Sequence, residues 1–144
     1  GLNDDALFYK MIDIIKKAKN GDLIFANFVE FDSLYGHRRD VAGYASALER
    51  FDLKLVKLLE IINPNDFLII TADHGNDPTF KGTDHTREKV PVLMVGNYAQ
   101  KGNNGNIVFS DVGATMADFL DLSGKLKGTN IFYDNNKLEK KCKT

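Results

Sequence analysis

With 144 residues, of which 43% are hydrophobic, the chain is long enough for one domain with a buried core. Its 19 basic and 20 acidic residues give a net charge of −1, so composition supports neither nucleic acid nor an anionic membrane as a partner. A single cysteine excludes a disulfide framework, and no apolar run approaches the roughly 20 residues of a membrane span. We therefore expect a cytoplasmic protein.

The chain alternates predicted helices with apolar, strand-like runs. In chain order, the hydrophobic spacing predicts a helix over residues 4–20, a strand over 22–31, a helix over 40–62, a strand over 67–72, a loop over 73–89, a strand over 90–96, a loop over 97–106, a short strand over 107–109 and a helix over 111–121. This alternation indicates an α/β fold, with a largely parallel sheet covered by helices on both faces.

Capping residues set the expected boundaries of the helices. Asn3 or Asp4 can cap the first helix, Asp40 the second, and Ser110 the last. Pro64 disfavours helical geometry at the residue before it, so the second helix should end there.

All three histidines of the chain, and two aspartates, follow the predicted strands. Asp32 stands where the first strand ends, and His37 comes five residues later. Asp73 and His74 end the second strand, and His85 lies in the loop that leaves it. Ligands of open α/β sheets bind outside the carboxyl ends of the strands, so these five side chains should meet at one edge.

Histidine and aspartate together indicate a transition-metal site. Neutral imidazole and carboxylate suit Zn or Mn better than Ca or Mg. Five ligands are too many for one catalytic ion, whereas two ions about 3.5–4 Å apart could share them in the usual clamp for phosphoryl chemistry. Taken singly, each residue has a simpler interpretation, such as a helix cap or a surface histidine. The joint arrangement is what favours metal.

Other polar residues in these segments have less specific interpretations. Asp84 could be a further ligand, but a turn residue or a partner that orients His85 is the favoured interpretation. Arg38, Arg39 and Arg87 could bind phosphate, although such residues more often pair with nearby acids.

Three segments carry a family resemblance. They are NFVEFDSLYGHRRDVAGYASALERFD (27–52), TADHGNDPTFKGTDHTREKVPVL (71–93) and FSDVGATMADFL (109–120). Together they closely resemble the phosphopentomutase family of the alkaline phosphatase superfamily, and the likeness covers nearly the whole chain.

The resemblance implies an enzyme with two divalent metal ions, usually Mn. Such an enzyme interconverts ribose 1-phosphate and ribose 5-phosphate, or the deoxyribose pair, through a phosphorylated threonine and a sugar bisphosphate. Carried over residue by residue, Asp32, His37 and His85 would ligate one ion, and Asp73 and His74 the other.

The resemblance also implies parts that these residues do not supply. The family's core begins with a strand that bears another metal-ligating Asp, followed by the threonine nucleophile and an inserted cap domain. No threonine here matches the nucleophile motif, and the chain begins at Gly1 without a Met. We therefore expect residues 1–133 to be the C-terminal half of the metal-binding core, and residues 134–144 a polar tail. Its partners would be the pentose phosphate and the remaining core and cap segments.

Two other functions stay open on the sequence. Cofactor-independent phosphoglycerate mutase, of the same superfamily, shares the ADHG string, but there the first Asp and His are typically four residues apart, whereas Asp32 and His37 are five apart. Other phosphatases of this superfamily are more distant. A non-catalytic interaction module on a degenerate scaffold would be expected to have lost a ligand, and none is missing from this span.

Overall fold

The computed structural model describes residues 3–124 and 126–132 of the chain. The chain divides into two compact units, which are Gly1–Asn63 with Ile69–Leu93, and Pro64–Leu68 with Met94–Thr144. The expected tail, 134–144, lies outside the described residues.

Two helices of the first unit follow the predicted caps. Helix α1 spans Asp4–Ile15, and the Asn3 side chain accepts a hydrogen bond from the Ala6 N–H at 2.8 Å. Helix α2 spans Val41–Ile61, and Asp40 caps it by accepting from the Gly43 N–H at 2.8 Å.

Helix α1 is shorter than the sequence predicted. The residues after Ile15 are mostly lysines, which add no large side chain to the buried face. Because short helices depend on packing of that face, the last predicted turn does not form.

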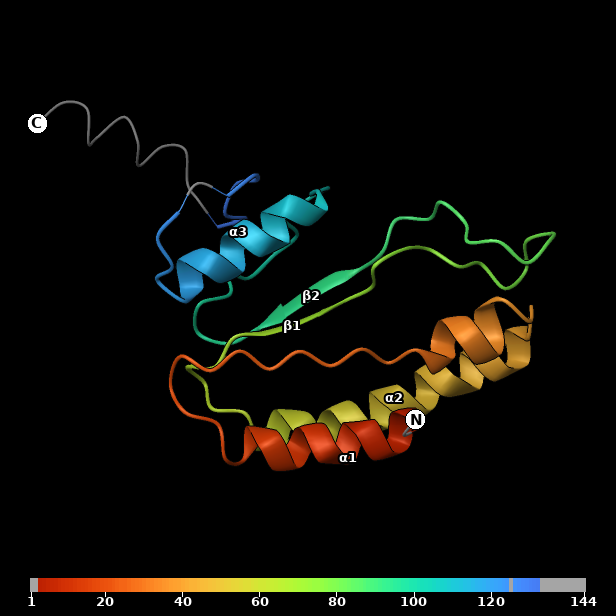
Figure 1. Ribbon diagram of the computed structural model, residues 1–144, viewed down its shortest axis with the longest axis horizontal. Coiled ribbons are helices and arrows are strands. Elements are labelled where there is room, and N and C mark those ends of the chain that lie inside the picture. Colours follow the sequence, from red (N-terminus) through yellow and green to blue (C-terminus); the bar gives the residue numbers. More distant parts are fainter. Residues whose placement is uncertain (1–2, 125, 133–144) are drawn as a thin grey trace, which may run out of the picture. The chain divides into compact units, whose positions relative to one another are not determined.

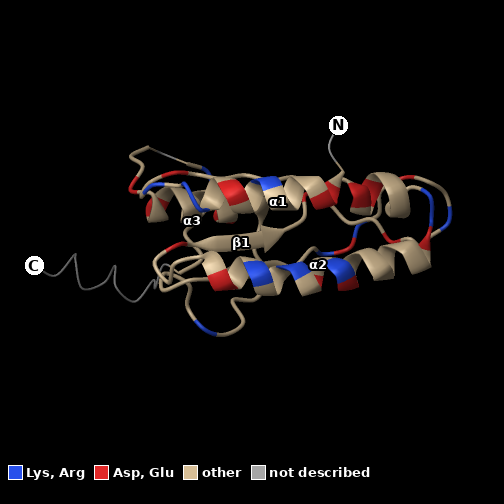
Figure 2. Ribbon diagram, turned by 90° about the horizontal axis from the view of Figure 1, so that it is seen from below, with Lys and Arg blue, Asp and Glu red and all other residues tan. Residues whose placement is uncertain are grey.

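An aromatic cluster holds α1 against α2. Phe8 is fully buried, and its ring lies 6.4 Å from those of both Phe28 and Phe51, centroid to centroid. An ion pair between Asp5 and Lys54 joins the same two helices, which lie side by side (Figure 1). Acidic and basic residues are interspersed along both helices (Figure 2), so neither presents a field of one sign.

The sheet is smaller than predicted. Strands β1 (Leu68–Thr71) and β2 (Val92–Val95) pair in a two-stranded sheet, and they are the only strands in the described part of the chain. Strand β1 was predicted closely. Strand β2 begins after Pro91, which has no N–H to donate to a ladder. The fold is mixed α and β, without the broad parallel sheet that we expected.

The predicted strand over residues 22–31 is wrong for this structure. The segment runs extended beside the helices without pairing to either strand (Figure 1), and Phe31 already begins the next helical turn. A strand needs a neighbour for its backbone N–H and C=O groups, and neither strand of the described chain supplies one. Leu23 and Phe25 are 61% and 86% exposed, so the apolar pattern that predicted a buried strand has no cover here.

The second unit contains the last helix, α3, which spans Phe109–Phe119. The predicted short strand at 107–109 and the Ser110 cap are both wrong, because the helix begins two residues earlier than expected. The Asp111 carboxylate stabilises that start by accepting from the Val108 N–H at 3.0 Å. Four aromatic rings pack within this unit, those of Phe67, Tyr98, Phe119 and Phe132.

No helix in the described residues is both long and apolar enough to cross a membrane.

Replacing Phe8 by Ala should lower the free energy of unfolding by about 3–5 kcal/mol, because a fully buried ring is lost and its three aromatic neighbours cannot close the space. Denaturant unfolding followed by circular dichroism would measure the change. Leu53, which is 71% exposed on α2, is the control, and its replacement by Ala should change stability by less than about 0.5 kcal/mol. Equal effects of the two substitutions would show that the α1–α2 cluster is not the core of this unit.

Candidate metal centre

The turn before α2 is a π-helix, Phe31–Gly36, and it places two candidate ligands together. The His37 N–H donates to the Asp32 carbonyl at 2.9 Å, a bond that spans five residues. In an α-helix, with 3.6 residues per turn, residues five apart point in clearly different directions. The wider π turn brings His37 back over Asp32. The five-residue spacing is therefore matched by the local backbone.

A second segment returns on itself after β1. Gly75 and Thr86 form an isolated antiparallel bridge, with the Thr86 N–H donating to the Gly75 carbonyl at 3.1 Å. His74 and His85 each precede one bridge partner, so they are diagonal neighbours on one face of the pairing. Their rings stack with centroids 3.8 Å apart. Two histidines eleven residues apart in the sequence are thereby brought into contact.

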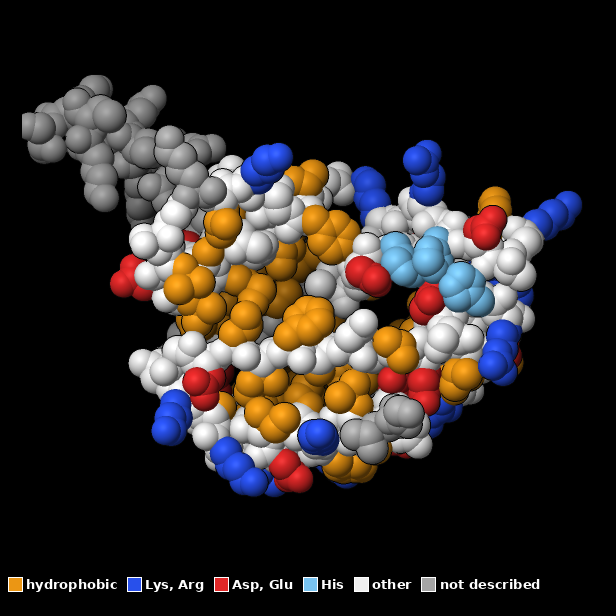
Figure 3. All heavy atoms as spheres, viewed as in Figure 1, with side chains coloured by type: hydrophobic (Ala, Val, Ile, Leu, Met, Phe, Trp, Pro, Cys, Tyr) orange, Lys and Arg blue, Asp and Glu red, His pale blue; other side chains and the backbone are white. Residues whose placement is uncertain are grey.

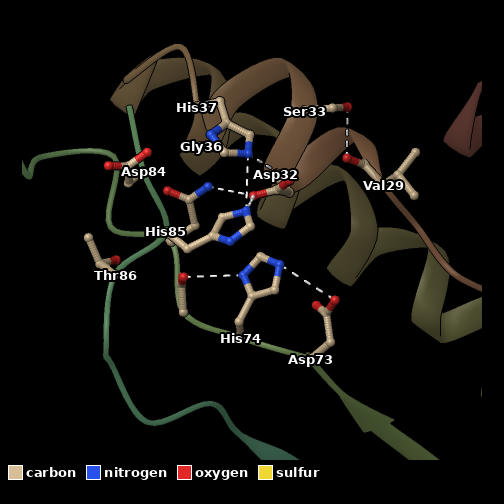
Figure 4. Close-up of polar contacts among 12 residues, drawn as sticks. Val29, Asp32, Ser33, Gly36, His37, Asp73, His74, Asp84, His85 and Thr86 are labelled. Atoms are coloured by element: carbon tan, nitrogen blue, oxygen red, sulfur yellow. Dashed lines mark hydrogen bonds and ion pairs between the residues drawn. The ribbon is translucent and has the colours of Figure 1, made fainter. Parts of the chain in front are cut away.

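Three of the five predicted residues converge on one point. Nε2 of His37 lies 3.3 Å from Asp32 Oδ2, and Nε2 of His85 lies 3.4 Å from Asp32 Oδ1. The two Nε2 atoms are 3.1 Å apart, and all three ligand atoms lie within 4.8 Å of one another. Figure 4 shows the imidazoles and the Asp32 carboxylate pointing toward a common centre.

Hydrogen bonds fix which nitrogen of His37 faces this centre. Its Nδ1 contacts the Thr83 carbonyl oxygen, which can only accept, so Nδ1 carries the proton. In the neutral ring, Nε2 then presents a lone pair toward Asp32 and His85. A ring N–H bound to a backbone carbonyl is the usual support of a metal-ligating histidine.

The donor set fits a divalent transition metal. Two imidazole nitrogens and one carboxylate all direct electron pairs to one place, and these groups repel unless a cation or a proton lies between them. This composition suits Zn or Mn. The three histidines form one continuous patch on the surface, with carboxylates beside it (Figure 3), so an ion could reach them from solvent.

Asp73 and His74 form a pair next to the trio. Asp73 Oδ2 lies 3.5 Å from His74 Nε2, and His74 Nδ1 lies 3.3 Å from the Gly75 carbonyl. The Asp73 side chain is 79% exposed. Within the described residues only Asp32, His37 and His85 make a ligand group of three, and Asp73 and His74 are not part of it.

The sequence did not single out the residue that contacts Asp32 most closely. Asn76 Nδ2 donates to Asp32 Oδ1 at 2.5 Å, and Asn76 in turn accepts from Arg39. Arg39 was expected to pair with a nearby acid, whereas its side chain donates to backbone carbonyls and to this amide. Asp84 contributes its carbonyl oxygen to Arg39, in keeping with its interpretation as a turn residue.

Two ionisable groups beside the centre have shifted pKa values. Burial raises the pKa of Tyr44, and the negative charge of Asp32 raises it further. At Asp77 the backbone N–H and the hydroxyl of Thr79 donate to the carboxylate and lower its pKa. The Asp77 N–H also donates to the Thr86 hydroxyl at 2.6 Å, which ties the turn to the bridge.

A family model described as "Metalloenzyme superfamily" matches residues 2–124 of this chain. The chain belongs to this superfamily. A metal-dependent chemistry therefore agrees with the donor set at Asp32, His37 and His85.

Within the Metalloenzyme superfamily, the chain is similar to curated proteins of one particular kind. The chain is 52% identical over 128 residues to a phosphopentomutase of Yersinia enterocolitica, and 54% identical over 127 residues to a phosphopentomutase of Buchnera aphidicola. Each match covers 88% of this chain but 31% of the relative. The chain thus spans about a third of the length of these relatives.

Replacing Asp77 by Ala should destabilise the loop at pH 7 and have a smaller effect at pH 3. Its folded pKa lies below the ordinary value of 3.8, so its stabilising contribution is complete above that value and is lost as pH falls through the folded pKa. Unfolding by urea at the two pH values would measure the difference. Asp52, exposed on α2, is the control, and a pH-independent penalty at Asp77 would contradict the assignment.

Proposed function

We propose that this chain carries the metal-binding part of a phosphopentomutase, an isomerase that interconverts (deoxy)ribose 1-phosphate and (deoxy)ribose 5-phosphate. The observation that supports it most is the convergence of Asp32, His37 and His85 in a chain that is 52% and 54% identical to relatives of that name. The substrate is a pentose phosphate, and the cytoplasm, where such metabolites occur, is the expected location.

In this proposal Asp32, His37 and His85 hold one divalent ion, and Asp73 and His74 belong to a second, with Mn as the metal. Two such ions, when bound, polarise phosphoryl oxygens and offset the charge that develops during transfer. The chain's own residues supply the electron pairs and their direction. The Nδ1–H of His37, held by Thr83, turns Nε2 toward the proposed ion, and Asn76 orients Asp32.

The nucleophile of the proposed reaction, a threonine that carries the phosphoryl group, lies outside these residues. So do a further metal-ligating Asp and the cap that binds much of the sugar phosphate. The coverage of 31% of the relatives' length leaves room for all three.

We further propose that residues 1–133 are the C-terminal half of an alkaline-phosphatase-like core, in which residues 22–31 join a wider parallel sheet. Exposed apolar side chains support this arrangement. Leu23, Phe25 and Val29 are all half exposed or more along an extended segment that pairs with neither strand of the described residues. A run of this composition is typical of a strand buried on both faces.

Metal binding should weaken as pH is lowered from 7.5 to 5.5. Protons compete with the ion for the imidazole nitrogens, and three histidines contribute to the proposed sites. Titration calorimetry with MnCl₂ at the two pH values would measure the affinity. Equal affinity at both values would show that the histidines are not ligands.

Replacing Asp73 and His74 together by Ala should lower kcat of the protein, at its full natural length, by about 100-fold or more. An ion that polarises a phosphoryl oxygen contributes several kcal/mol, and each 1.36 kcal/mol is a tenfold change in rate. The assay is conversion of ribose 1-phosphate to ribose 5-phosphate with Mn and a sugar bisphosphate primer.

Asp52→Ala, on the exposed side of α2, is the control and should leave the rate unchanged. No interconversion by the unaltered protein would reject the mutase assignment. Full activity after replacement of both Asp73 and His74 would reject the metal assignment instead.

A further inference from the structure

The side chain of Arg39 joins the two segments that carry the metal ligands. On the side of the π turn, Nη1 donates to the Gly36 carbonyl at 3.0 Å. On the side of the loop, Nη1 donates to the Asp77 carbonyl at 3.0 Å, Nη2 to the Asp84 carbonyl at 2.5 Å, and Nε to the Gly82 carbonyl. One guanidinium thus binds one carbonyl of the π turn and three carbonyls of the 77–84 loop.

These contacts reach the histidines through the backbone. Gly82 and Asp84 flank Thr83, whose carbonyl oxygen accepts from Nδ1 of His37. Asp84 also immediately precedes His85. Arg39 therefore fixes the stretch of loop whose Thr83 carbonyl accepts from the His37 ring and whose next residues carry the His85 ring to the centre.

Asn76 extends the same network to the third ligand. Its Oδ1 accepts from Arg39 Nη1 at 2.6 Å, and its Nδ2 donates to Asp32 Oδ1 at 2.5 Å. Arginine can only donate, and an ionised carboxylate can only accept, so this amide can face only one way. Arg39 therefore selects the amide orientation that offers Asp32 a donor.

Gly36 makes room for this amide. A Cβ at position 36 would collide with the Asn76 side chain, both at its carbonyl carbon and at Nδ2. The glycine has right-handed helical backbone, so close approach, rather than an unusual φ angle, requires it here.

The backbone of Arg39 has a positive φ of 55°, which non-glycine residues seldom adopt. Such conformations persist where surrounding contacts determine them, and they cluster at functional sites. Here the contacts are the five hydrogen bonds of the side chain.

We propose that Arg39 and Asn76 are positioning residues of the metal centre: Arg39 binds the 77–84 loop to the π turn, and Asn76 orients Asp32. Together they hold Asp32, His37 and His85 in place before an ion binds. The inference rests on the proposed function for the presence of the ion. The same contacts argue against phosphate binding by Arg39, because each of the three guanidinium nitrogens already donates to the protein.

The test is the affinity of the metal-free protein, at its full natural length, for Mn²⁺ and Zn²⁺ by titration calorimetry. Arg39→Lys keeps the charge but cannot bridge the carbonyls and the amide, and it should weaken binding about 10- to 100-fold, as loss of an outer partner typically does. Arg38→Ala is the matched control. Arg38 is exposed and its side chain makes no hydrogen bond or ion pair in the described chain, so affinity should change less than about twofold.

Gly36→Ala provides an independent variant, because it displaces the Asn76 amide without removing any hydrogen-bonding group. Metal affinity should again fall, and combining it with Arg39→Lys should cost less than the sum of the single changes, since both act through Asn76. Thermal unfolding without metal separates positioning from general stability: positioning requires affinity losses in variants whose metal-free unfolding matches that of the unaltered protein.

Unchanged affinity in both Arg39→Lys and Gly36→Ala would overturn the inference while leaving the proposed function intact. A loss in Arg38→Ala equal to that in Arg39→Lys would also overturn it, since the effect would then not depend on the hydrogen bonds that Arg39 makes. Absence of any divalent-ion binding by the unaltered protein would reject both the metal site and the positioning role.

Discussion

Three electron-pair donors within 4.8 Å of one another are the constraint on which the centre depends. Without a cation or a proton between them, the donor atoms of Asp32, His37 and His85 repel one another. All three side chains are partly exposed, so burial does not hold them together. The structure opposes this repulsion with directed contacts on the far side of each ligand. Thr83 holds His37, Asn76 holds Asp32, and the Gly75–Thr86 bridge places His85.

The position of the site could be predicted from the sequence, although one of the premises failed. Asp32 and His37 were placed at the end of a strand that does not form in this structure, yet they meet His85 as expected. Their arrangement depends on the π turn and on the loop, both of which are local. The five-residue spacing of Asp32 and His37 was a visible signal of that turn, since an α-helical turn would separate them. Helix α2 and strand β1 were predicted well because their hydrophobic patterns and caps agree.

The network around the ligands could not be predicted in the same way. Arg39 contacts residues up to 45 positions away, and Asn76 contacts one 44 positions away, so neither leaves a periodic or spaced pattern. Asn76 resembles any polar loop residue, and its role depends on a neighbour that fixes its amide orientation. Similarly, the apolar run at 22–31 indicates a strand, but whether a strand forms depends on a neighbour that the described chain does not contain.

The two candidate ligand sets differ in how complete their support is. The contacts that orient the trio come from residues 32–63 and 69–86, so its geometry is determined within one compact unit. Asp73 and His74 are held unequally: the His74 ring stacks on His85 and contacts the carbonyl of its own neighbour, Gly75, whereas Asp73 faces solvent. Preorganised donors bind an ion without the cost of ordering them, whereas loose donors must be ordered when the ion arrives. Under the proposed function, the trio would therefore bind its ion more tightly than the pair, which would gain comparable strength only when another ligand restricts it.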